Sequence, residues 1–487
     1  MRRALFGVAT VSALAAVASC SLGLDESLIG RTPDASLPDT PIEDASTPDV
    51  TEDGPPPPTP EGGVCTKDED CKTAHGCLTA KCDLGRKACV FPVCRSAACS
   101  SAACDAATQK CGAPSTYKYR AAQFSVGAAI GRCIAAVHPF LFVGTVDGVV
   151  AFDVGDPQNA APRKVPVIAL TFLPTQMIAS GSRVFFVGPP TGAAPSARVP
   201  LAWIDVPATP FVDKITAQSV LATYNRPPNE GVLLHPREND TALLLNQAAA
   251  ASYPAAAVEP PLVEPLTLTA TPIPLTAGMV PQTTSGTRLV MNVITIGAPS
   301  FAFVNGAGSA APQNAGDVAL GPAAPVGPSQ AFATSPDGAV FWSSTSLTGT
   351  PGQPMVFARA VKSYFLVVGA AANFDATKGV DVEVYAPGVQ VGQNAQLAGP
   401  VALLDAKTAL VTTAIPANLA QTNVQFVKLD PLGVVKNADM QPRRLPITLP
   451  IGQLAAAGSH GIGYVLAVDP NAPAAPVVHV FDPECAP

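Results

Sequence analysis

The sequence predicts an all-β fold for most of the chain, on three observations. Pro and Gly number 52 and 39 of the 487 residues and are spread along the chain, which leaves little room for long helices. Charged residues make up 13%, about half the usual share, which excludes a highly charged or coiled-coil protein. From about residue 115, short apolar runs alternate with Gly, Pro, Asn and Asp, as in domains of many strands.

The N-terminus predicts an export signal over residues 1–19. Two arginines precede an apolar stretch that is too short for a permanent membrane helix. Val17–Cys20, with the sequence VASC, resembles the lipobox of bacterial lipoproteins. The resemblance implies that Cys20 is acylated and becomes the new N-terminus, and that Ser21 directs sorting to the outer membrane. The alternative is a plain signal peptide with an incidental cysteine.

We predict that residues 20–62 form an acylated N-terminus followed by a disordered tether. Residues 25–62 hold ten acidic residues, nine prolines and a single basic residue, Arg31. Such a segment buries too little apolar surface to fold, and an extended form of about 40 residues would reach on the order of 120 Å. We predict a spacer, with calcium or a basic partner as the alternative role of the acidic stretch.

Residues 63–114 form a cysteine-rich segment for which we predict a small disulfide module. The segment is polar and lacks a core, and export would place it in an oxidising compartment, so covalent bridges would replace the core. It resembles short cysteine-rich repeats of secreted proteins and bacterial lipoproteins. Zinc or an iron–sulfur cluster is the alternative, although no C-x2-C pair occurs. The nine candidate disulfide cysteines are Cys65, Cys71, Cys77, Cys82, Cys89, Cys94, Cys99, Cys104 and Cys111.

Residues 115–487 predict a β-propeller-like domain. The clearest unit spans 140–157 and reads as a strand, a tight turn at Asp147-Gly148 and a second strand. Its ending, apolar residues followed by Asp and then Val or Pro, recurs along the domain, and the first and last intervals between these aspartates are equal. We interpret the aspartates as structural turn residues whose carboxylates accept backbone N–H groups. They are Asp153, Asp205, Asp430 and Asp482.

Residues 140–165 resemble the LVIVD type of bacterial β-propeller repeat, which implies the architecture and little more. The intervals fit seven or eight blades, and we predict seven. An array of β-sandwiches is the alternative. A propeller brings its two ends together, so Cys133 and Cys485 are also disulfide candidates, as a bridge that locks the ring. The Ala- and Pro-rich stretch 248–265 is predicted to be a loop insert.

No catalytic site, metal site or cofactor is predicted. The motifs of zincins, α/β-hydrolases, P-loop proteins and dinucleotide-binding proteins are all missing from the sequence, and the five histidines are scattered. The densest acidic group is Asp375, Asp381 and Glu383, which we interpret as a loop and a strand edge. Propeller enzymes gather catalytic residues from several blades, and this leaves no linear motif.

The net charge of −7 comes from residues 1–62, and no basic face is evident for nucleic acid, so that class is excluded. We therefore predict a non-enzymatic, lipid-anchored envelope protein, periplasmic or surface-facing, whose propeller binds a protein or glycan partner. Its only membrane attachment would be the acyl chain. The alternatives are a propeller enzyme acting on an extracellular polymer and a passive structural component of the envelope.

Overall fold

The computed structural model describes residues 66–70, strand segments between 74 and 111, and residues 119–483 apart from loop segments. The longest gaps in 119–483 are 320–329, 367–379 and 445–453. By its internal contacts the chain divides into two units, one of residues 22–92 and 106–109 and the other of the remaining residues.

The smaller unit contains only short elements. Its described residues form a single turn of 3-10 helix, η2, and two strand pairs. Asp70 closes the turn by accepting from the backbone N–H of Thr66 (2.8 Å), a hydrogen bond that lowers the pKa of this carboxyl. The elements are η2 (Asp68–Asp70), β1 (Ala74–His75) with β2 (Leu78–Thr79), and β3 (Lys81–Asp83) with β4 (Ala88–Val90).

The larger unit is built almost entirely from antiparallel sheets. Its described residues form one short strand pair and seven sheets of four or five strands, which follow one another in the chain order of their first strands. The short pair is β5 (Cys104–Asp105) with β6 (Lys110–Cys111). The first sheet is β8 (Ile134–Val137), β9 (Phe140–Thr145), β10 (Gly148–Asp153), β11 (Lys164–Ile168) and β15 (Ile215–Thr216). The second is β12 (Gln176–Ser180), β13 (Arg183–Val187), β14 (Ser196–Asp205), β16 (Gln218–Asn225) and β20 (Leu266–Leu268).

The next three sheets follow the same scheme. The third is β17 (Val232–Pro236), β18 (Ala242–Asn246), β19 (Ser252–Val258) and β21 (Thr271–Pro274). The fourth is β22 (Met279–Ser285), β23 (Arg288–Val293), β24 (Ser300–Asn305) and β25 (Gln313–Ala319). The fifth is β26 (Gln330–Thr334), β27 (Val340–Thr348), β28 (Val356–Leu366), β29 (Val380–Val384) and β30 (Gln390–Val391).

The last two sheets complete the series. The sixth is β31 (Ala398–Asp405), β32 (Thr408–Ile415), β33 (Asn418–Asp430), β34 (Val434–Lys436) and β35 (Arg443–Arg444). The seventh is β36 (Leu454–Ser459), β37 (Ile462–Ala467) and β38 (Val477–Pro483), with β7 (Tyr119–Ser125) as its fourth strand. The final sheet therefore takes its outer strand from the start of the domain.

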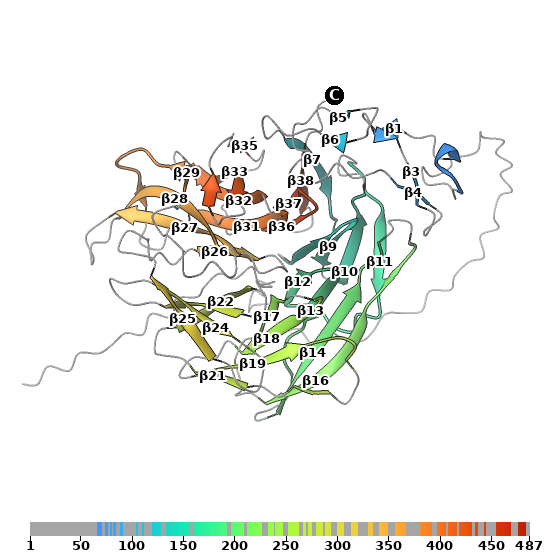
Figure 1. Ribbon diagram of the computed structural model, residues 1–487, viewed down its shortest axis with the longest axis horizontal. Coiled ribbons are helices and arrows are strands. Elements are labelled where there is room, and N and C mark those ends of the chain that lie inside the picture. Colours follow the sequence, from blue (N-terminus) through green and yellow to red (C-terminus); the bar gives the residue numbers. More distant parts are fainter. Residues whose placement is uncertain are drawn as a thin grey trace, which may run out of the picture. The chain divides into compact units, whose positions relative to one another are not determined.

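The first strands of the seven sheets contact one another in a closed cycle. Each first strand contacts the first strand of the next sheet, and β36 of the last sheet contacts β8 of the first. Figure 1 shows the sheets succeeding one another in the colour order of the chain. Sheets arranged in a cycle, with the last one completed by an N-terminal strand, are typical of a β-propeller. The predicted all-β fold is thus confirmed, and the propeller architecture is supported.

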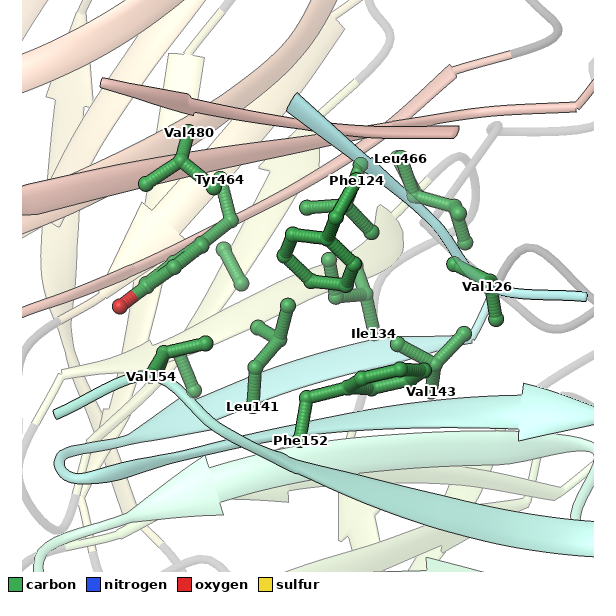
Figure 2. Packing of buried hydrophobic residues seen from close by; sticks show 14 of the residues in the cluster. Phe124, Val126, Ile134, Leu141, Val143, Phe152, Val154, Tyr464, Leu466 and Val480 are labelled. Carbon is green, nitrogen blue, oxygen red and sulfur yellow. The ribbon is translucent and has the colours of Figure 1, made fainter. Parts of the chain in front are cut away.

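An apolar core joins the first and last sheets. Phe124 of β7 and Phe152 of β10 lie with ring centroids 4.9 Å apart, and Leu141 and Tyr464 pack in the same cluster (Figure 2). All four side chains are almost fully buried. Removal of these side chains from water stabilises the contact between two sheets that lie far apart in the sequence.

The innermost strand β8 packs against a core on each of its two faces. Ile134 and Ala136 face the core between the last and first sheets, whereas Ala135 and Val137 face the core between the first and second sheets. Alternate side chains of a strand point to opposite faces, so one short strand contributes to two cores. All four positions are consequently buried.

The local pattern predicted several of these strands. The hairpin of β9 and β10 is confirmed, with one refinement: Thr145 pairs with Gly148, so Asp147 lies in the turn and Gly148 already belongs to β10, with a φ of 131°. The predicted insert 248–265 is wrong in part, because Ser252–Val258 forms β19, which pairs with both β18 and β21. This part of the stretch is therefore the third strand of its sheet.

Among the residues described, no helix is both long and apolar enough to cross a membrane.

Candidate functional site

Loops that join the first and second strands of neighbouring sheets lie against each other at several points of the ring. We call the described part of these loops the hairpin rim, and define it by residues 138–139, 181–182, 237, 239–241 and 460–461 of the first, second, third and seventh sheets. Hydrogen bonds connect rim residues of the second sheet to the third, of the first to the seventh and of the seventh to the sixth, as described below. Because rigid strands hold these short loops, the hairpin rim is a fixed surface on which a binding site can be built.

The rim brings together two histidines that are remote in the sequence. His138 follows β8 and His460 follows β36, and their ring centroids lie 5.1 Å apart with an interplanar angle of 45°. Ser459 connects them: its Oγ accepts from the backbone N–H of His138 (3.1 Å) and lies 3.0 Å from Nδ1 of His460. His138 is half-buried, whereas His460 is exposed.

The turn at His460 explains how the sequence presents this side chain. Ser459 pairs with Ile462 across the hairpin, which leaves His460 and Gly461 as a two-residue turn with φ angles of 53° and 80°. Positive φ at both positions is the geometry of a tight hairpin turn that matches the strand twist. Gly461 donates its backbone N–H to the carbonyl of Leu404 in the sixth sheet (2.8 Å), which fixes the turn against its neighbour.

The second and third sheets are connected at the rim in a similar way. Asp240 accepts from the backbone N–H of Ser182 at 2.6 Å, and Ser180 donates its hydroxyl to the carbonyl of Arg237 at 2.5 Å. A Cβ on Gly181 would lie 2.0 Å from the carboxylate of Asp240 and would displace it, and the φ of 57° at this position also favours glycine. These contacts hold the rim rigid, and the carboxylate of Asp240 has a structural role in them.

The first strands carry few groups that could perform chemistry. Across the seven first strands, the titratable residues are His235 of β17 and Asp405 of β31. His235 is buried, and desolvation lowers its pKa to about 4, so the imidazole is neutral at physiological pH. The remaining positions are mostly Ala, Val, Leu, Ser and Thr.

A second polar cluster lies between the fifth and sixth sheets. Glu383 of β29 accepts from the side chains of Gln425 (2.7 Å), Asn423 (3.3 Å) and Thr413 (3.4 Å). Burial raises the pKa of Glu383, and the three hydrogen bonds partly oppose this effect. Tyr385, whose pKa is also raised by burial, donates its hydroxyl to the carbonyl of Ala414 (2.8 Å). This cluster satisfies a half-buried carboxylate and connects two sheets.

The acidic group noted in the sequence lies on that same strand. Asp381 and Glu383 both belong to β29, which pairs with β28 alone among the described strands, and Asp381 forms an ion pair with Lys362 (3.5 Å). Asp375 lies outside the described residues. The interpretation of Asp381 and Glu383 as part of a strand edge agrees with this placement. Within the described ranges, no group of three or more His, Cys, Asp or Glu side chains is placed to hold a metal ion.

The four recurring aspartates occupy equivalent places. Asp153, Asp205, Asp430 and Asp482 lie at or next to the C-terminal end of the third strand of their sheets. Asp153 accepts from the backbone N–H of Gly155 (3.1 Å), and burial raises its pKa.

The other three aspartates differ in their surroundings. Asp205 accepts from the side chains of Arg183 and Gln218 and forms an ion pair with the former. Asp482 is buried, and the side chain of Asp430 lies outside the described residues. The four aspartates therefore share a position in their sheets but make different local contacts.

The cysteine predictions fall mainly outside the described part of the chain. Cys82 lies opposite Cys89 in the β3–β4 pair, and Cys104 lies opposite Cys111 in the β5–β6 pair. Cys82 and Cys133 each take part in a disulfide bond. The proposed partner of Cys133, Cys485, is outside the described residues, as are Cys20, Cys65, Cys71, Cys77, Cys94 and Cys99.

No pattern in the sequence connects His138, Ser459 and His460. Their separation is 321 or 322 residues, and no histidine lies within four residues of another. The one available signal is positional, because each histidine occupies the turn after the first strand of a sheet. Recognition of that equivalence requires the boundaries of every sheet.

Comparison with known proteins adds little about function. No protein family matches the sequence, and no curated protein matches it. Among solved structures, a protein from Lactobacillus plantarum is similar at 12% identity and a TM-score of 0.33, over 80% of this chain and 96% of that one.

Two further structures are similar to the chain. A puromycin-hydrolyzing peptidase of Mycobacterium tuberculosis matches at 12% identity and a TM-score of 0.35, over 80% of this chain and 53% of that one. TolB from Acinetobacter baumannii matches at 12% identity and a TM-score of 0.28, over 71% and 78%. With TM-scores this low, these similarities carry no argument about what the chain binds or catalyses.

Proposed function

We propose that this chain is a lipid-anchored cell-envelope protein whose seven-bladed β-propeller binds a protein or glycan partner. Cys20 carries the acyl anchor, residues 20–62 form the tether, and residues 63–114 form a disulfide-rich module. The propeller of residues 115–487 then projects from the outer membrane. The seven sheets in a cyclic order support the number of blades.

We base the proposal of binding rather than catalysis on the residues that make up the first strands. Enzymes built on a propeller gather acids or histidines from several blades around the axis, because acid–base chemistry needs two or more groups in reach of one substrate. Here the seven first strands contribute only His235 and Asp405, from the third and sixth sheets. His235 is also buried with a pKa of about 4, which suits a structural position.

The rigidity of the rim supports the same proposal. The hydrogen bond between Ser182 and Asp240 fixes two neighbouring loops to each other, and the one between Gly461 and Leu404 fixes a loop to the neighbouring strand β31. A preorganised surface loses little conformational freedom on binding, which is the main cost that a flexible surface would incur. Short loops held in this way suit recognition of a partner without chemical change.

Two variants of the full-length chain separate the anchor from the binding role. Expression in a Gram-negative host with membrane fractionation and intact mass measurement tests the anchor: we expect a diacyl or triacyl adduct on Cys20 and a soluble Cys20→Ala variant. A Cys20→Ser variant serves as the matched control and should also be soluble. An unmodified N-terminus, or a Cys20→Ala variant that remains in the membrane fraction, would contradict the anchor.

Binding is then measured with the released Cys20→Ala protein. Glycan arrays and immobilised envelope extracts provide the probes, and we expect saturable binding that competes with unlabelled protein. Binding that rises without saturation on every surface would instead favour a passive structural component. Cleavage of an array glycan or an extracted polymer would favour the enzyme.

A further inference from the structure

Two outer strands belong by chain order to the sheet that follows. In the chain, β15 lies between β14 and β16 of the second sheet, but it pairs in parallel with β11 of the first sheet. In the same way, β20 lies between β19 and β21 of the third sheet and pairs in parallel with β16 of the second. We call β15 and β20 the clasp strands. Among the strands that the structure describes, no other sheet receives a strand from the connection between the third and fourth strands of its neighbour.

The first clasp strand is fixed to both sheets that it connects. The side chain of Ile215 is 2% exposed and belongs to an apolar cluster that also contains Val165 of β11 and Ile204 of β14. Directly after β15, the backbone N–H of Ala217 donates to the carbonyl of Ile168 at the end of β11 (2.9 Å). Apolar burial and backbone pairing therefore both hold β15 against the edge of the first sheet.

The turn after β11 adds a further connection between these two sheets. Ala169 has a φ of 62°, a left-handed conformation that is unfavourable for a residue with a Cβ. Its carbonyl accepts from the hydroxyl of Ser219, which belongs to β16 of the second sheet (2.8 Å). A strained residue persists where surrounding contacts hold it in place, and this contact comes from the neighbouring sheet.

The second clasp strand repeats this arrangement one sheet further on. Its three residues pair with residues 222–224 of β16. Leu262, in the connection that leads from β19 to β20, packs against an apolar cluster that contains Trp203 of β14 and Leu244 of β18. The connection that carries β20 is therefore fixed to a core that the second and third sheets share.

We propose that the two clasp strands couple the first three sheets into one cooperative unit. For β11 to open, its pairing with β15 must break, and this releases a segment that lies directly between β14 and β16 of the second sheet. Opening of β16 in turn breaks its pairing with β20, which the third sheet supplies. The three sheets thus share the free energy of opening, and their amides become exposed to solvent together. This coupling does not depend on any partner that the rim binds.

Native-state hydrogen exchange of the full-length protein tests the coupling. In the wild type, we expect the most protected amides of β10, β14 and β18, one strand from each sheet, to exchange at rates within about tenfold of one another. Ile215→Ala should separate them, so that the amides of β10 exchange at least about tenfold faster than those of β14. Ile204→Ala is the matched control, because it makes the same change in the same cluster outside the clasp strand, and it should leave the ratio of these two rates unaltered.

A second pair of variants decides the outcome if Ile215→Ala does not fold. Ser219→Ala removes only the hydroxyl that holds Ala169, and should raise the ratio of the β10 rate to the β14 rate by about twofold or more. Ser182→Ala is its control, because Ser182 contacts the third sheet through its backbone N–H, and the ratio should not change. Wild-type rates in β10 and β14 that already differ by more than about tenfold, or a ratio that neither clasp variant alters, would overturn the proposal. The clasp strands would then only cover the edges of two sheets.

Discussion

The side-chain amide of Gln176 pairs with both backbone groups of Leu234. Its Oε1 accepts from the N–H of Leu234 at 2.6 Å, and its Nε2 donates to the carbonyl of the same residue at 2.8 Å. Gln176 belongs to β12 and Leu234 to β17, and both are buried. Leu234 lies in the first strand of the third sheet. Its backbone N–H and carbonyl are thus paired with a side chain of the second sheet instead of with a neighbouring β-strand.

Replacement of Gln176 should therefore destabilise the propeller. Gln176→Ala leaves a buried backbone donor and a buried acceptor without partners, for which we expect a loss of about 2–4 kcal/mol in the free energy of unfolding. Gln218→Ala is the control, because Gln218 is exposed and its loss should cost less than about 0.5 kcal/mol. Urea unfolding of both variants checks this, and equal midpoints would show that the Gln176 pairing contributes nothing.

A second prediction concerns the core between the first and last sheets. Phe124 of β7 is 4% exposed, and its truncation to alanine should lower the free energy of unfolding by about 3–5 kcal/mol. Phe357 is 40% exposed, so Phe357→Ala should cost less than about 1 kcal/mol. The comparison uses the same chemical change at two depths. If the two variants unfold alike, β7 is not packed into the core.

Gly458 tests the contact between the sixth and seventh sheets. A Cβ at this position would lie 2.2 Å from the backbone carbonyl oxygen of Leu403, which cannot move away without displacing β31. We expect Gly458→Ala to lower Tm, at a cost of about 1–3 kcal/mol. At Gly388, which has no heavy atom within 4 Å of a built Cβ, alanine should cost only the strain of φ 89°. Calorimetry of both variants would refute the tight contact if Gly458→Ala were the more stable.

Acid should weaken the fold through two buried histidines. Desolvation lowers the pKa values of His235 and His479 to about 4, from 6.5 in the unfolded chain. Between these values the unfolded state binds more protons, so stability is complete above pH 6.5 and falls as the pH decreases towards 4. Each histidine contributes up to about 3 kcal/mol of this loss. Urea unfolding from pH 7 to pH 4.5 measures it, and a flat profile would contradict the burial of both imidazoles.

Glu383 should show the opposite dependence. Burial raises its pKa in the folded state, so its contribution to stability increases as the pH falls through that raised value. Glu383→Gln removes the charge and keeps the shape, and we expect little change in stability at pH 7. Glu383→Ala leaves the side chains of Gln425, Asn423 and Thr413 without their acceptor and should cost about 1–3 kcal/mol. Equal losses in the two variants would exclude a role for these hydrogen bonds.

Local sequence patterns predicted single hairpins well. The strand, turn and second strand predicted around Asp147 correspond to β9 and β10, because strand formation there follows from neighbouring residues.

The closure of the ring and the histidine pair could not be predicted in detail. The pairing of β7 with β38 depends on which strand fills the last edge after all the other sheets have formed. The contact between His138 and His460 follows from that closure and from two tight turns. Both are consequences of long-range topology, for which a single sequence offers no local signal.

Hydrogen–deuterium exchange of the full-length protein tests the closed ring most directly. Residues Tyr119–Ser125 pair with Val477–Pro483 along the whole of β7. If the ring is closed in this way, the amides of β7 should be protected to within about tenfold of those in β38, because both open only when the last sheet does. Rapid exchange of β7, at the rate of an unstructured peptide, beside a protected β38 would contradict the account.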